Sequence, residues 1–177
     1  SLNYYWYSLA PVALGISTYY PLAKGEIDLF LRFKNVFDLA YRRYMDIEQA
    51  LAQAREAQIE AALEKVRSRS LAMHNSDELK EVVGVLYNQL MELGFGLDLG
   101  AVNILIFQQG SKDHFEWIAD PGQAYPRPFR VPYSDHPIVT TLINAWEHGP
   151  GFITKLFPYK EKKKYFGHLL QQDEWKL

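Results

Sequence analysis

The chain has 177 residues, of which 48% are hydrophobic and 23% are charged, and its formal net charge is -2. This composition is typical of a folded chain with one or two small domains, and the small charge gives no argument for binding nucleic acid. The absence of cysteine excludes disulfides, thiolate metal sites and a thiol nucleophile, and fits the cytoplasmic location that we expect. The longest apolar run, residues 9–16, is too short to span a bilayer.

Residues 3–20 alternate in the manner of two β-strands. Tyr4 and Trp6 alternate with Tyr5 and Tyr7, and residues 12–18 repeat the pattern, which predicts a hairpin. Because a lone two-stranded hairpin is only marginally stable in water, we expect it to join a larger sheet.

A single long helix is predicted from about Gly25 to about His74, since no proline interrupts this stretch. Its apolar residues recur at alternating steps of three and four, which is typical of a helix that packs on another helix. Steps of four between Ala54 and Val66 make this seam drift around the helix as a stutter does. The predicted dimer seam comprises Phe30, Phe33, Phe37, Tyr44, Ile47, Leu51, Ala54 and Val66.

Roughly fifty residues at about 1.5 Å each would form a rod of about 70 Å. Small domains at either end cannot cover such a rod, so we expect a homodimer. The alternative is that one face of the helix packs on its own domain.

The second half of the chain predicts an α+β domain in which helices flank an antiparallel sheet. A cap at Asn75 with Glu78 opens its first helix, and Gly94 is expected to end it. Asp135 is expected to cap the helix that begins near Pro137. The predicted helices cover residues 76–93, 137–148 and 159–172, and the predicted strands cover 101–108, 115–119, 129–131 and 152–156.

This order of elements resembles the first three-quarters of a GAF domain. The amino-acid sequence of residues 54–74, with the following Ser76-Asp77-Glu78-Leu79, is similar to the linker and opening helix of GAF domains in bacterial sensor histidine kinase-like proteins. A GAF domain normally ends in two further strands and a closing helix, which residues 3–20 and 26–37 resemble. The resemblance implies a hairpin segment (1–25), a signalling helix (26–74) and a GAF-like domain that lacks its closing strands (75–177).

The resemblance further implies a non-catalytic sensory segment of a signal-transduction protein, such as a two-component system, with an output domain elsewhere in a longer parent. Ligand would favour one packing of the domain against the helix, and the stutter would permit two helix registers. The family holds its ligand between the sheet and the covering helices and loops. The residues that this implies are Trp117, Tyr133, Asp135, His136 and Thr140.

An alternative to the sensory interpretation remains open for this segment. The aromatic residues around the predicted sheet would equally fill the core of a domain without a ligand. The whole chain would then be a purely structural dimerisation module. The identity of any cofactor is left open by the sequence.

Catalytic and metal-binding interpretations find little support. Enzymes with a GAF fold that reduce methionine sulfoxide use cysteines, and no nucleotide-binding or hydrolase motif appears. His114, His136 and His148 lack the spacing of a helical zinc motif. We therefore expect neither catalytic nor metal-ligating residues.

The hairpin and the incomplete sheet suggest a specific dimer. Unpaired strand edges accept further strands readily, and a stiff rod keeps the hairpin from the sheet of its own chain. Two antiparallel chains would place each hairpin beside the partner's sheet, which is a closed, domain-swapped arrangement.

Overall fold

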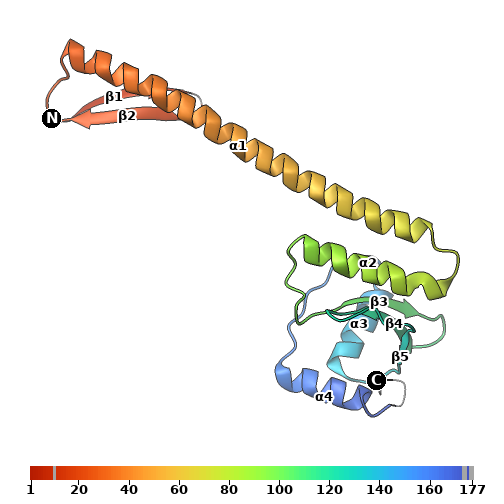
Figure 1. Ribbon diagram of the computed structural model, residues 1–177. Coiled ribbons are helices and arrows are strands. Elements are labelled where there is room, and N and C mark those ends of the chain that lie inside the picture. Colours follow the sequence, from red (N-terminus) through yellow and green to blue (C-terminus); the bar gives the residue numbers. More distant parts are fainter. Residues whose placement is uncertain (10, 173–174, 176–177) are drawn as a thin grey trace. The chain divides into compact units, whose positions relative to one another are not determined.

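The computed structural model describes residues 1–9, 11–172 and 175 and shows an α+β chain with a long helix and two small antiparallel sheets (Figure 1). This confirms the predicted class and the predicted helix. The chain divides into two compact units, Ser1–Ile59 (unit 1) and Glu60–Leu177 (unit 2). The long helix α1 (Lys24–Leu71) crosses the boundary between them.

Unit 1 contains the predicted hairpin and the first part of α1. Strands β1 (Asn3–Ser8) and β2 (Ala13–Thr18) pair antiparallel, with Trp6 opposite Gly15. The Tyr5 hydroxyl accepts a 2.8 Å hydrogen bond from the Leu22 N–H, and the Lys34 ammonium lies 4.3 Å from the centre of the Tyr7 ring. Among the described residues of this unit, none is buried, so unit 1 has no hydrophobic core of its own.

The junction that follows α1 is held by its capping residues. The Asn75 side chain accepts from the Asp77 N–H at 3.0 Å, and the Glu78 carboxylate accepts from the Asn75 amide at 2.8 Å. The predicted cap is therefore confirmed, although it opens a short 3₁₀ turn, η1 (Ser76–Glu78), ahead of helix α2 (Leu79–Glu92).

Helix α2 ends just before Gly94, as the sequence predicted. Gly94 has a φ of 87°, which suits a residue without a Cβ atom. The Phe95 N–H donates to the Leu90 carbonyl and the Gly94 N–H donates to the Met91 carbonyl. These two bonds form a Schellman motif, which satisfies carbonyls that the helix end leaves unpaired.

The sheet of unit 2 has the antiparallel order β3-β4-β5, formed by β3 (Val102–Phe107), β4 (His114–Ala119) and β5 (Phe129–Val131). The strand predicted at 152–156 is wrong. These residues have no regular structure, and Phe152 and Leu156 are more than nine-tenths exposed. A short alternating run cannot form a strand unless a neighbouring strand pairs with it.

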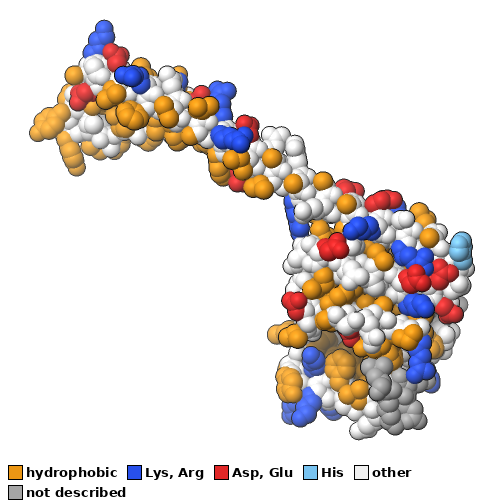
Figure 2. Space-filling view, viewed as in Figure 1, with side chains coloured by type: hydrophobic (Ala, Val, Ile, Leu, Met, Phe, Trp, Pro, Cys, Tyr) orange, Lys and Arg blue, Asp and Glu red, His pale blue; other side chains and the backbone are white. Residues whose placement is uncertain are grey.

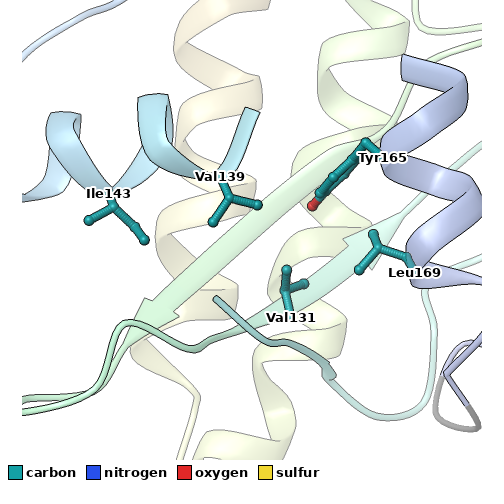
Figure 3. Packing of buried hydrophobic residues seen from close by; sticks show 5 residues of the cluster. All are labelled: Val131, Val139, Ile143, Tyr165 and Leu169. Atoms are coloured by element: carbon teal, nitrogen blue, oxygen red, sulfur yellow. The ribbon is translucent and has the colours of Figure 1, made fainter. Parts of the chain in front are cut away.

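The two faces of this sheet carry two separate cores, and α2 covers one face while α3 (Pro137–Glu147) and α4 (Tyr159–Leu169) cover the other (Figure 1). On the α2 face, Trp117 and Ala119 pack with Val83 and Tyr87. On the opposite face, the side chains of five residues point toward one another from β5, α3 and α4 (Figure 3), and these residues are Val131, Val139, Ile143, Tyr165 and Leu169.

Replacing Trp117 by alanine is expected to lower the free energy of unfolding by about 3–5 kcal/mol, because it leaves a large void in the α2-facing core. Urea unfolding followed by circular dichroism measures this. Trp6→Ala is the control, since Trp6 is 67% exposed. Equal losses for both variants would contradict the assignment of Trp117 to the core.

Candidate functional site

The candidate site is a cavity of about 390 Å³ in unit 2, between the sheet and helices α3 and α4. Small-molecule sites are typically concave and mostly apolar, with a few polar groups. The sheet contributes Asn103, Glu116, Ile118 and Phe129 to the cavity wall, and the helices contribute Ile138, Leu142, Tyr165, Phe166 and Leu169. Ala101, Asp120, Tyr125 and Trp175 complete the lining.

The alternation of β4 decides which of its side chains reach this cavity. Successive residues of a strand point to opposite faces. Glu116 and Ile118 therefore line the cavity, whereas Trp117 and Ala119 belong to the core on the α2 face. One strand thus contributes to the candidate site and to the packing of α2.

Glu116 is a buried carboxylate at the sheet side of the cavity, with 6% of its surface exposed. One carboxylate oxygen lies 3.0 Å from the His114 Nε2 atom, and the other accepts a 3.2 Å hydrogen bond from the Asn103 amide. His114 is completely buried, and its Nδ1 atom has no hydrogen-bond partner among the described residues. A buried carboxylate needs such partners, and these fix Glu116 in place.

A second carboxylate, Asp120, organises the turn after β4. Its Oδ2 atom accepts from the Tyr125 hydroxyl at 2.7 Å, and its Oδ1 atom accepts from the Gly122 and Gln123 N–H groups. The Tyr125 hydroxyl and these backbone donors lower the pKa of Asp120. The same hydrogen bond to Asp120 raises the pKa of Tyr125, so Tyr125 remains a neutral donor.

Aromatic side chains form much of the remaining wall. The Tyr125 and Phe129 rings meet edge to face at 5.3 Å, and Phe129 lies 4.6 Å from the Trp175 ring. On α4, Tyr165 and Phe166 meet edge to face at 5.3 Å. Burial, with a smaller contribution from the charge of Glu116, raises the pKa of Tyr165, so its hydroxyl stays protonated.

The structure divides the five predicted ligand residues between different places. Trp117 lies on the α2 face of the sheet, away from the cavity. The Tyr133 hydroxyl donates to Asp135 at 2.6 Å, and Tyr133 is exposed. The Thr140 hydroxyl bonds within the first turn of α3, to the carbonyls of His136 and Pro137. None of the five lines the main cavity.

His136 and Asp135 line a separate, smaller pocket of about 360 Å³, which Tyr165 shares. The expectation that Asp135 caps α3 is wrong. His136 is the cap, because its Nδ1 atom accepts from the Ile138 N–H at 3.2 Å. Asp135 instead accepts from Tyr133. The His136 Nε2 atom lies 3.3 Å from a Glu161 oxygen.

Sequence reasoning missed the residues that give the main cavity its polar character, namely Glu116, Asp120 and Tyr125. One signal was available, because the alternation of residues 114–119 places Glu116 and Trp117 on opposite faces. A sequence pattern alone does not say which face carries the cavity.

The predicted dimer seam falls into two parts. In unit 1, Phe30 is half-buried and the other predicted residues are exposed, with exposed fractions of 64% for Phe33 and 61% for Leu51. Figure 2 shows the hydrophobic side chains of unit 1 gathered over the hairpin and α1. In unit 2, Val66 is half-buried and nearby Ala62 is buried.

Comparisons with models of protein families, with curated proteins and with solved structures return no match for this chain. Within the described residues, no helix is long and apolar enough to cross a membrane. The same residues contain no group of three or more histidine or acidic side chains suited to holding a metal ion.

Replacing Asp120 by asparagine is expected to lower the free energy of unfolding by about 1 kcal/mol at pH 6, since it weakens the hydrogen bonds to a charged acceptor. Because the folded pKa of Asp120 is lowered from its ordinary value of 3.8, its contribution is complete above that value and is lost as the pH falls through the folded pKa.

The difference between the wild-type chain and Asp120→Asn should therefore shrink below about pH 4, as urea unfolding at several pH values will show. Asp135→Asn serves as a control for removing an exposed carboxylate. A difference that stays constant down to pH 3 would contradict the role given to the ionised Asp120.

Proposed function

We propose that this chain is a non-catalytic sensory segment of a bacterial signalling protein, in which unit 2 is a GAF-like domain that binds a small molecule. The observation that carries the proposal is the cavity of about 390 Å³ on one face of the sheet. Its apolar and aromatic lining, with a buried carboxylate held by two partners, has the make-up of a recognition site.

The packing of β4 supports a route from this cavity to the helices. Glu116 lines the cavity, and the adjacent Trp117 packs on Val83 and Tyr87 of α2. A ligand that displaces β4 would therefore alter the packing of α2. Such a shift requires only that the ligand binds one arrangement more tightly than the other.

A charged junction ties α2 to the end of α1 within unit 2. One Arg69 nitrogen lies 3.0 Å from Glu78 and 2.7 Å from Glu81, and the Arg69 side chain is only 21% exposed. Burial opposes ionisation of Glu78, but the bonds from Arg69 and the His74 N–H prevail and lower its pKa. This ion pair would transmit a movement of α2 to the last turns of α1.

We also propose that α1 mediates a homodimer, with a second copy of this chain as the partner. Unit 1 has no buried side chain among its described residues, yet large apolar residues line one face of its helix. A helix with such an apolar stripe normally buries it. A matching stripe on a second copy would do so in a two-fold arrangement.

Exchange of hairpins between the two copies is a further part of this proposal. The β1-β2 ribbon has two strands, and β3 and β5 each pair only with β4 among the described residues. Both sheets thus offer unpaired edges, which favour strand addition. Adding the partner's hairpin would complete the GAF-like sheet.

Filling the cavity should abolish ligand binding without unfolding the chain. A thermal-shift screen with cyclic nucleotides, haem, organic cations and small metabolites is expected to find a compound that raises the unfolding midpoint of the wild-type chain by several degrees. A ligand present at 100 times its Kd stabilises by about 2.7 kcal/mol. Leu142→Trp, which narrows the cavity, should remove this shift.

Leu170→Trp is the matched control, because Leu170 is 56% exposed and lies outside the cavity lining. It should retain the shift. If no compound of any class stabilises the wild-type chain, the sensory proposal fails, and a purely structural dimerisation module becomes the better description.

Placing a charge in the seam should dissociate the dimer. Leu51→Lys is expected to convert a dimer into a monomer in sedimentation velocity, because it buries an unpaired charge between two helices. Leu39→Lys is the control, since Leu39 is similarly exposed but lies about 120° around the helix. A monomeric wild-type chain, or equal effects of both variants, would refute the seam.

The direction of the two chains can be read from crosslinking, since the chain has no native cysteine. Mixed Phe33→Cys and Val66→Cys proteins should give the mixed product with a bismaleimide if the chains run antiparallel. A product joining two copies at position 33 would indicate parallel helices and exclude the exchange of hairpins.

A further inference from the structure

The charged side chains in the described lining of the main cavity have one sign. Glu116 and Asp120 both line it, whereas its described lining contains no lysine, arginine or histidine. Asp120 is a carboxylate whose ordinary pKa already keeps it ionised at neutral pH, and the bonds from Tyr125 and backbone N–H groups lower that pKa further. Among the described lining residues, an anionic ligand would meet carboxylates without a compensating cationic side chain.

Two hydrogen-bond donors at the cavity wall already serve the carboxylates of Glu116 and Asp120, and these carboxylates can accept further bonds from a ligand. The Asn103 amide already donates to Glu116, and the Tyr125 hydroxyl already donates to Asp120. Each carboxylate oxygen has more than one lone pair. The two oxygens of Glu116 each have one protein partner, so Glu116 can accept further hydrogen bonds or face a positive charge.

The aromatic lining suits the same kind of ligand. Five of the described lining residues are aromatic, namely Tyr125, Phe129, Tyr165, Phe166 and Trp175. They come from both sides of the cavity, because Phe129 lies on the sheet, and Tyr165 and Phe166 lie on α4. The faces of aromatic rings attract cations, and such rings grouped around a cavity are the usual means of recognising alkylated ammonium groups.

We propose that the cavity binds an organic cation, specifically an alkylated ammonium compound whose methyl groups contact the aromatic rings and whose charge is balanced by Glu116 and Asp120. This inference rests on the proposed sensory function and names the ligand class of that site. The combination of aromatic rings and carboxylates in one cavity carries it, since carboxylates alone would equally suit an inorganic cation. A volume of about 390 Å³ holds more than a metal ion and falls within the range of small-molecule sites.

Calorimetric titration of the full chain tests the inference with probes matched in shape. Choline and benzyltrimethylammonium are the cationic probes, 3,3-dimethyl-1-butanol is the neutral analogue of choline, and a cyclic nucleotide is the anionic probe. Choline is expected to bind at least tenfold more tightly than the neutral analogue, and the cyclic nucleotide is expected not to bind.

Two variants locate the interaction. Glu116→Gln should weaken choline binding at least tenfold and leave the neutral analogue unaffected, while Glu147→Gln, which changes an exposed glutamate outside the lining, should alter neither. Phe166→Ala removes a partly exposed ring and should weaken choline binding severalfold even if Glu116→Gln fails to fold.

The outcomes separate this inference from the proposed function. If the neutral or the anionic probe binds as tightly as choline, the cationic ligand class is wrong but ligand sensing stands. The same conclusion follows if neither cationic probe binds while another class of compound stabilises the chain through the cavity: the cationic ligand class is wrong, but ligand sensing stands. If no compound of any class binds, both proposals fall.

Discussion

The two-residue alternation of β4 is the constraint on which unit 2 depends. Side chains of a strand alternate between faces. His114 and Glu116 therefore lie on the face covered by α3 and α4, whereas Trp117 and Ala119 lie on the face covered by α2. A shift of register by one residue would exchange these faces, burying Glu116 against α2 and removing the tryptophan from its core. The candidate site and the hydrophobic core therefore stabilise the same register.

Burying polar residues on the cavity face is unfavourable in free energy, and hydrogen bonds from neighbouring residues offset part of it. A buried carboxylate is destabilising unless it has hydrogen-bond partners, and Glu116 has these in His114 and Asn103. His114 in turn is fully buried, and its Nδ1 atom is unpaired within the part of the chain that the structure describes. A domain selected for packing alone would place apolar residues here, because well-packed apolar groups are often at least as stable as buried charged ones. The polar groups on this face are the reason to propose a binding role rather than a simple core.

The sequence predicted the elements whose local signals are strong. The long helix, the hairpin, the Asn75 cap and the Gly94 helix end follow from helix propensity, alternation and cap chemistry. The strand at 152–156 failed because pairing depends on residues far away in the chain. Asp135 was a reasonable cap by residue type, but His136 holds that position, and only the backbone path decides between neighbours. The cavity residues come from strands, a turn and two helices, a grouping that no short pattern encodes.

The edge of β3 links the two proposals made for this chain. Asn103 of β3 and the preceding Ala101 line the cavity and are exposed, and β3 has one hydrogen-bonded neighbour, β4, among the described strands. A strand added to this edge would therefore form a new wall of the cavity as well as extend the sheet. If the partner's hairpin supplies that strand, ligand binding and assembly share an interface, and thermodynamic linkage requires each to strengthen or weaken the other equally. A dimer that breaks on losing its seam would then also change its affinity for ligand, whereas a dimer held by the helix alone would not.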